Sequence, residues 1–135
     1  MLSLLRVRLV LALCQNVEMH TAYVVTTVLF ALAVTFSGVG KIRRDPIPVK
    51  VVHETIGIPL KYLPMLAACE FAGVLGLVVG IWWPPIGIAA GIGLLLYFVG
   101  AIVAHLRIGD AKGIGPAVFM FAVAAGALAL RVMTV

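Results

Sequence analysis

One carboxylate lies within an otherwise uncharged apolar stretch of this sequence. Glu70 is the only charged residue between Tyr62 and Trp83, and this stretch is long enough to cross the hydrocarbon core of a bilayer. A carboxylate at membrane depth costs about 2.5–3.5 kcal/mol on insertion scales. Glu70 therefore needs a partner, a proton or a function, and it is the main candidate for chemistry in the chain.

Three states are open for the Glu70 side chain. It is neutral and donates a hydrogen bond, it is ionised and paired with Lys41, or it lines a wet cavity reached from the cytoplasm. Two roles are open as well. One is a polar lock between helices, and the other is a functional site for a proton, a polar headgroup or a quinone oxygen.

Other polar side chains lie at a similar predicted depth. Counting about 1.5 Å per helical residue places Glu70 about 12 Å inside its stretch and Tyr97 at a comparable depth. The hydroxyl side chains that precede Lys41 lie about 6–9 Å deep. We expect these groups to converge in the cytoplasmic half of the protein. The candidates for a ligand or proton site are Glu70, Tyr97, Lys41, Ser37 and His105, with Thr35 nearby.

Patterns for catalysis are missing from the sequence. It has no nucleophile motif, phosphate-binding loop or haem motif, and Cys14 and Cys69 do not form a Cys-x-x-Cys dithiol. The three histidines are not spaced as metal ligands, so we predict no metal site and no catalytic residue. Arg107 with Asp110 is interpreted as a loop ion pair or a headgroup contact.

The elements that must position these side chains are membrane-spanning helices. Apolar residues make up 64% of the chain and charged residues only 11%, with a mean hydropathy of +1.22. A soluble domain usually has about 25% charged residues. We predict an all-α membrane protein, an up-down-up-down bundle of four transmembrane helices, in residues 19–135. The predicted spans are Thr21–Gly40, Tyr62–Trp83, Pro85–Leu106 and Gly113–Leu130.

The positive charge is concentrated in two of the predicted connections. Five basic residues lie between the first and second spans and two between the third and fourth, out of ten in the chain. Short loops rich in lysine and arginine stay in the cytoplasm. We therefore expect a multi-pass protein of the inner (cytoplasmic) membrane with basic loops inside and both termini outside. The net charge of +5 is explained by topology and by anionic headgroups, not by nucleic acid.

Two local patterns refine this bundle. Between Pro48 and Gly57, apolar residues at helical spacing predict a short interfacial helix. Small residues recur every four positions in the spans, as at Ala72, Gly76 and Gly80, and such ladders allow close helix approach. Packing within one chain is the preferred explanation, and a homodimer seam is the alternative.

The first eighteen residues differ from the rest of the chain. Arg6 and Arg8 precede a short apolar run, and no signal-peptide cleavage site follows. Two interpretations stay open. Residues 1–18 form an interfacial amphipathic extension, or they are a start-site artefact and Met19 is the natural start.

Four short motifs occur in a fixed order along the chain: Gly38-x-x-Lys41, Gly57-Ile58-Pro59, Glu70-x-x-Gly73, and His105 with Gly109-Asp110. Together they resemble those of the DoxX-like family of small four-helix integral membrane proteins, and the resemblance covers roughly Thr21 to Arg131. It implies the four-helix fold, and it implies kinship with membrane subunits of redox or stress-response assemblies, among them the small membrane subunit of thiosulfate:quinone oxidoreductase. The family has no agreed catalytic motif, so the polar positions are carried over by analogy only.

Two classes of function follow from these observations. The first is a non-catalytic membrane subunit or scaffold of an oxidoreductase or stress-response assembly, with a peripheral redox protein docked on its cytoplasmic face. The alternative is a protein that binds a quinone or a lipid in a polar pocket around Glu70. A small transporter or proton conductor is less favoured, because one four-helix unit is thin for a pathway and would need a homo-oligomer.

Overall fold

Four long apolar helices make up most of the chain. The computed structural model describes all residues 1–135, and its long helices are α1 (Leu2–Arg43), α3 (Leu63–Val79), α4 (Pro84–Arg107) and α5 (Ile114–Met133). Each of the four lies in a helical segment long and apolar enough to cross a membrane. No strand is present. The predicted all-α fold with four spanning helices is confirmed.

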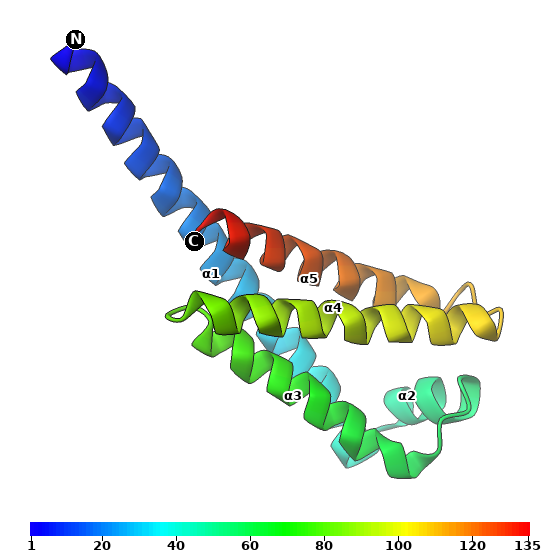
Figure 1. Cartoon of the computed structure of the whole chain (residues 1–135). Coiled ribbons are helices and arrows are strands. Elements are labelled where there is room, and N and C mark those ends of the chain that lie inside the picture. The colour runs from blue at the N-terminus through cyan, green and yellow to red at the C-terminus, as the bar shows by residue number, and fades with distance from the viewer.

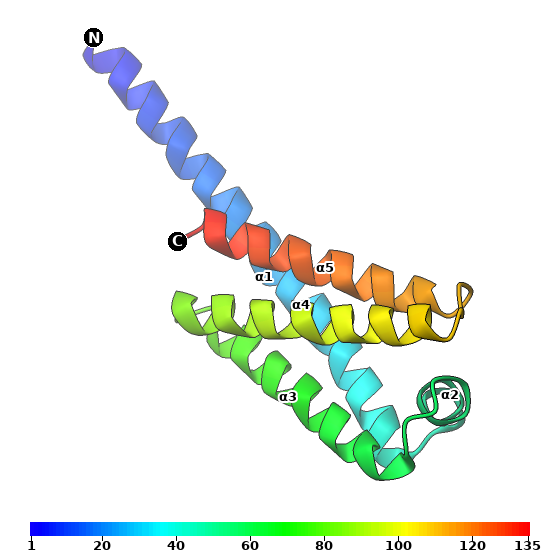
Figure 2. The same ribbon diagram turned by 45° about the vertical axis from the view of Figure 1, so that its right-hand side comes forward.

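The four helices pack as a closed ring. Both α1 and α4 contact α3 and α5, and the short links make successive helices antiparallel (Figures 1 and 2). The shared core lies in the middle of the ring, where Phe30 of α1 meets Phe98 of α4 with ring centroids 6.1 Å apart. Val34, Leu77, Leu94 and Ala124 complete this core.

The helix boundaries differ from the predicted spans at three places. The helix α3 ends at Val79, because Gly80 begins a turn that places Trp82 and Trp83 outside the helix. The helix α5 continues to Met133, beyond the predicted end at Leu130, and its 20 residues rise about 30 Å. The helix α1 begins at Leu2 and continues through Met19 without a break.

The first part of α1 extends beyond the bundle (Figure 1). Every residue from Met1 to Glu18 is exposed, and most of them are apolar. The segment is thus helical and makes no packed core of its own. Both interpretations of residues 1–18, an interfacial extension and a start-site artefact, stay predictions.

The connection between α1 and α3 contains the short helix that the sequence predicts. Arg44 adopts a left-handed conformation that ends α1, and the chain then forms α2 (Pro46–Pro48) and the π-helix η1 (Val49–Thr55). A 3-10 turn, η2 (Leu60–Tyr62), leads into α3. Val52 of η1 is buried, so the apolar face of this connection packs on the bundle.

The small residues of α3 and α4 bring these two helices into close contact. A methyl group on Gly76 would lie 2.6 Å from Cβ of Ala90, and one on Gly80 would meet the backbone of Gly87. The ladder of small residues is therefore used for packing within the chain, as preferred from the sequence.

Candidate functional site

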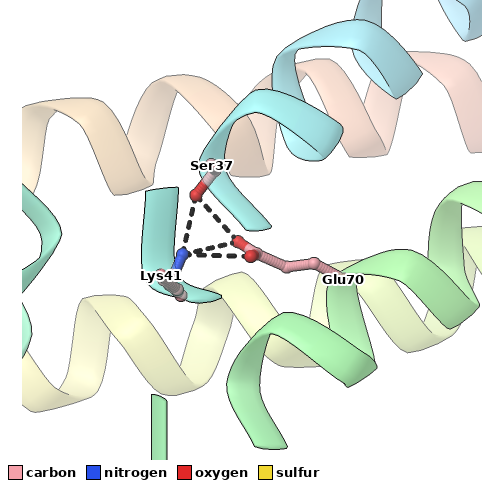
Figure 3. Close-up of polar contacts among 3 residues, drawn as sticks. All are labelled: Ser37, Lys41 and Glu70. Atoms are coloured by element: carbon pink, nitrogen blue, oxygen red, sulfur yellow. Dashed lines mark hydrogen bonds and ion pairs between the residues drawn. The ribbon is translucent and has the colours of Figure 1, made fainter. Parts of the chain in front are cut away.

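A buried ion pair joins α1 to α3. The Nζ atom of Lys41 lies 2.9 Å and 3.0 Å from the two carboxylate oxygens of Glu70. Nζ also donates to Oγ of Ser37 at 2.7 Å, and that hydroxyl donates to Oε1 of Glu70 at 3.0 Å (Figure 3). Glu70 is 1% exposed and Lys41 is 7% exposed. Of the three states open for Glu70, the structure has the pair with Lys41.

Helical spacing and one glycine explain how the three side chains meet. Ser37 and Lys41 are four residues apart near the end of α1, so both face the same neighbour. Gly38 lies between them, and a methyl group there would be 2.9 Å from the Phe71 ring and 3.4 Å from Oε2 of Glu70. The glycine therefore lets α3 approach closely enough for the carboxylate to reach α1.

All five predicted site residues line a single cavity of about 610 Å³. They come from three different helices, α1, α3 and α4, which confirms that the depth count brings them together. Thr35 is an exception, because it does not line this cavity. It is only two residues from Ser37 and so lies on another face of α1. The five are Ser37, Lys41, Glu70, Tyr97 and His105.

The rest of the cavity wall is mostly apolar. The connection before α3 supplies an aliphatic cover on one side, with Val51 and Val52 of η1 followed by Ile56 and Ile58. The helices α4 and α5 supply small and flexible apolar residues, among them Ala101, Ala104, Ala117 and Met120. Sequence reasoning missed this role of the interfacial helix. The apolar stripe of this helix indicates that one face is buried, but it does not indicate that this face covers a cavity.

His105 is fixed by a partner that the sequence did not identify. Its Nδ1 donates to Oδ2 of Asp110 at 2.9 Å, and the other oxygen of Asp110 accepts from the backbone N–H of Gly113 at 3.0 Å. The predicted Arg107–Asp110 ion pair is wrong, because no ion pair includes Arg107. The positive φ of Gly109 turns the chain back so that Asp110 faces His105.

The His105–Asp110 contact has two further consequences. The hydrogen bond from His105, followed by the one from Gly113, holds the pKa of Asp110 below its usual value. An ionised Asp110 keeps the proton of a neutral His105 on Nδ1, which leaves Nε2 as the free ring nitrogen. His105 is 4% exposed, so it is a buried member of the cavity wall and not a headgroup-facing side chain.

Lys41, Glu70 and His105, the ionisable side chains paired at the cavity wall, each have a partner within the chain. Lys41 is paired with Glu70, and His105 is paired with Asp110. Tyr97 lies against the edge of the Phe98 ring, with centroids 5.2 Å apart, and its hydroxyl lies close to the Glu70 carboxylate. The cavity can therefore offer a tyrosine hydroxyl and an imidazole nitrogen to a neutral molecule.

The structure contains neither a cluster of metal ligands nor a pair of neighbouring cysteines. No three His, Cys, Asp or Glu side chains come together as metal ligands. Cys14 and Cys69 are both free and exposed, and they lie on different helices. The candidate site thus consists of hydrogen-bonding side chains in an apolar cavity.

Comparison with known proteins agrees with the fold. The sequence profile of the DoxX-like family matches residues 25–127, which include all five cavity residues named from the sequence. No match was found among curated proteins or among solved structures. Because the match covers most of the chain and the four apolar helices agree with it, this multi-pass membrane protein belongs to the DoxX-like family.

Proposed function

We propose that this membrane protein binds a small amphipathic molecule with a neutral polar head in the cavity around Glu70. The observation that carries the proposal is the cavity itself, about 610 Å³ of mostly apolar wall with five polar side chains. Binding sites for small molecules usually have volumes of about 300–1,000 Å³, apolar walls and a few placed polar groups. A polar lock between helices would need no such space beside it.

The pairing of the ionisable side chains favours a neutral head over an anionic one. Lys41 is already paired with Glu70 and His105 with Asp110, so a bound phosphate would have no free cation to meet. A quinone carbonyl needs only hydrogen-bond donors. The Tyr97 hydroxyl can supply one, and the Lys41–Ser37–Glu70 cluster provides a polar wall beside it. A quinone is therefore the preferred ligand class, and a neutral lipid head is the alternative.

The length of the cavity also suits a ring with a tail. Tyr97 and His105 are eight residues apart on α4, which corresponds to about 12 Å of helix rise. Three of the four lining residues between them, Gly100, Ala101 and Ala104, are small, and the fourth is Phe98. A flat ring can lie against this surface while an isoprenoid or alkyl tail leaves toward the lipid.

A binding experiment tests the proposal. The purified chain in phosphatidylcholine nanodiscs is titrated with decylubiquinone, and organic extracts of the protein are analysed for quinones and lipids. We expect saturable binding that Tyr97→Phe weakens about tenfold, the usual effect of losing one well-placed hydrogen bond. Tyr62→Phe is the matched control, since Tyr62 is outside the cavity. No saturable binding, together with no enriched quinone or lipid, would contradict the proposal.

A second proposal is that this protein is a membrane subunit to which a peripheral protein binds. The exposed basic residues Arg43, Arg44, Lys50 and Lys61 lie in the connection before α3, and Arg107 and Lys112 lie at the link between α4 and α5. We propose that a peripheral redox protein with an acidic surface docks on this basic end, at the cytoplasmic face of the inner membrane. Gentle purification from native membranes tests it, with the expectation of one partner in near-stoichiometric amount that dissociates at high salt.

A further inference from the structure

A second buried polar cluster lies at the opposite end of the bundle from Glu70. Arg131 is in the last turn of α5 and is 3% exposed, and its guanidinium carbon lies 5.0 Å from the centre of the Tyr23 ring. Tyr23 and Thr27 lie one turn apart on α1 and are fully buried. None of the three lines the Glu70 cavity.

The polar atoms of this cluster lack partners. Nε of Arg131, the hydroxyl of Tyr23 and the hydroxyl of Thr27 are buried without any hydrogen bond. The only hydrogen bond of the guanidinium is a long one of 3.4 Å from Nη1 to Oγ1 of Thr134. Buried polar groups in proteins are almost always hydrogen-bonded, so three unpartnered ones at one place call for an explanation.

The charge of Arg131 has no counter-ion in the chain. The guanidinium stays protonated in any protein environment, and the chain's ion pairs are Lys41–Glu70, Arg43–Asp45 and His105–Asp110. Stacking on Tyr23 and a position at the C-terminal end of α5 both favour a cation. Neither supplies an acceptor for Nε–H, however, and an unpaired buried charge is strongly unfavourable.

A hollow lined by both polar and apolar residues lies next to the cluster, and Arg131 and Tyr23 are behind this lining and not part of it. The volume of the hollow is about 440 Å³, and it lies between α1 and the end of α5, where Figure 1 places the C-terminus next to α1. Thr134, which accepts from Arg131, lines it. Asn16, His20 and Thr21 line it from α1, and the His20 ring is 6.5 Å from that of Tyr23. No acidic side chain is among its lining residues.

We infer that this end of the bundle is an anion-binding site, in which Arg131 and Tyr23 hold a phosphate group that enters through the hollow. A guanidinium forms paired hydrogen bonds with phosphate oxygens, and the unpartnered tyrosine hydroxyl of the cluster is a further donor. The phosphate belongs to an anionic lipid of the adjacent leaflet or to a free phosphate ion. Such a ligand supplies the missing negative charge and the missing acceptors together. The site is independent of the quinone proposal, because the two share no residue.

Native mass spectrometry with two ligand arms tests this inference. The chain carries a C-terminal tag, which keeps the chain-end carboxylate away from Arg131, and is reconstituted in phosphatidylcholine with increasing phosphatidylglycerol. A second sample contains phosphatidylcholine and inorganic phosphate. We expect wild type to retain phosphatidylglycerol, and Arg131→Gln to bind it at least about tenfold more weakly. Binding of inorganic phosphate instead would identify the free ion as the ligand.

Three further variants make the result decisive. Arg131→Lys keeps the charge and is expected to restore part of the anion binding, while Tyr23→Phe is expected to weaken it about threefold with the fold intact. Arg107→Gln removes an exposed arginine at the other end and serves as the matched control. The inference is overturned if neither anion binds wild type in preference to phosphatidylcholine, or if Tyr23→Phe and Arg131→Gln bind as wild type does.

Discussion

The pairing of Glu70 with Lys41 sets the properties of the cavity at the scale of single residues. Both charges are buried, and Ser37 completes a closed set of hydrogen bonds between them. Removing one member of a buried pair leaves the other charge without compensation, which costs more than the pair itself contributes. The pair therefore fixes the register of α1 against α3 and also keeps the cavity neutral.

Glu70→Gln is expected to destabilise the protein by about 3–5 kcal/mol, because the Lys41 ammonium would stay buried without a carboxylate. The double variant Lys41→Met/Glu70→Gln should recover much of this loss. Thermal unfolding in detergent measures both. Arg43→Gln, which breaks the exposed 3.9 Å contact with Asp45, is the control and should change stability by less than about 1 kcal/mol. If Glu70→Gln and Arg43→Gln lowered the stability by the same amount, the buried pair would have no special role.

Asp110 gives the stability a dependence on acid pH. Its pKa is lowered in the folded protein, so the unfolded chain binds the proton more readily. The stabilisation by ionised Asp110 is therefore fully present above the usual carboxyl pKa of about 4 and is lost as the pH falls through the lowered value. Melting temperatures of wild type and Asp110→Asn should differ at pH 6 and converge below pH 4. A difference that does not change with pH would contradict this account.

At the scale of elements, the closest helix contact determines where small residues are required. The backbones of α3 and α4 approach each other at Gly80 and Gly87, directly before and after the tight turn that joins these helices. A methyl group on Gly87 would lie 2.9 Å from Cα of Gly80 and 3.2 Å from its carbonyl oxygen. Backbone atoms cannot give way as a flexible side chain can, so the two helices would have to move apart.

Gly87→Ala is expected to destabilise the bundle by about 1–3 kcal/mol through this overpacking. Gly93→Ala is the matched control on the same helix, because nothing lies within 4 Å of the added methyl group there. Alanine favours a helix over glycine by up to about 1 kcal/mol, so this control should be neutral or slightly stabilising. Melting temperatures in one detergent compare the two. Similar changes in melting temperature for Gly87→Ala and Gly93→Ala would show that the effect comes from helix propensity and not from the contact with Gly80.

At the scale of the whole molecule, the two ends of the bundle differ in charge and in the sites that they hold. The end with the α1–α3 connection carries six of the eight exposed basic side chains and the cavity around Glu70. The other end carries both termini, the turn with Trp82 and Trp83, and the cluster of Arg131 with Tyr23 (Figure 2). The orientation in the membrane therefore decides which leaflet and which aqueous compartment each site meets.

Single cysteines test the orientation expected from the basic loops. In a chain with Cys14→Ser and Cys69→Ser, a cysteine is introduced at Ala111, in the α4–α5 link, or at Trp82, in the α3–α4 turn. A maleimide that does not cross membranes should label the Trp82 position in intact spheroplasts and the Ala111 position only after lysis. Labelling in the reverse order would place the basic loops outside and contradict the proposed topology.

The sequence by itself determined the four apolar helices, their order and the depth of the polar side chains. These depend on local composition and on a fixed rise per residue, and both can be counted along the chain. Counting was enough to bring Glu70 and Tyr97 to one level, and the structure places them in one cavity. Only the tertiary structure decided which partners the polar groups have, because this depends on helix rotation and on turns. The pairing of Asp110 with His105 requires the turn at Gly109, and the burial of Arg131 requires α5 to pack beside Tyr23 of α1, so helical periodicity predicts neither contact, although His105 and Gly109-Asp110 stand together in one sequence motif.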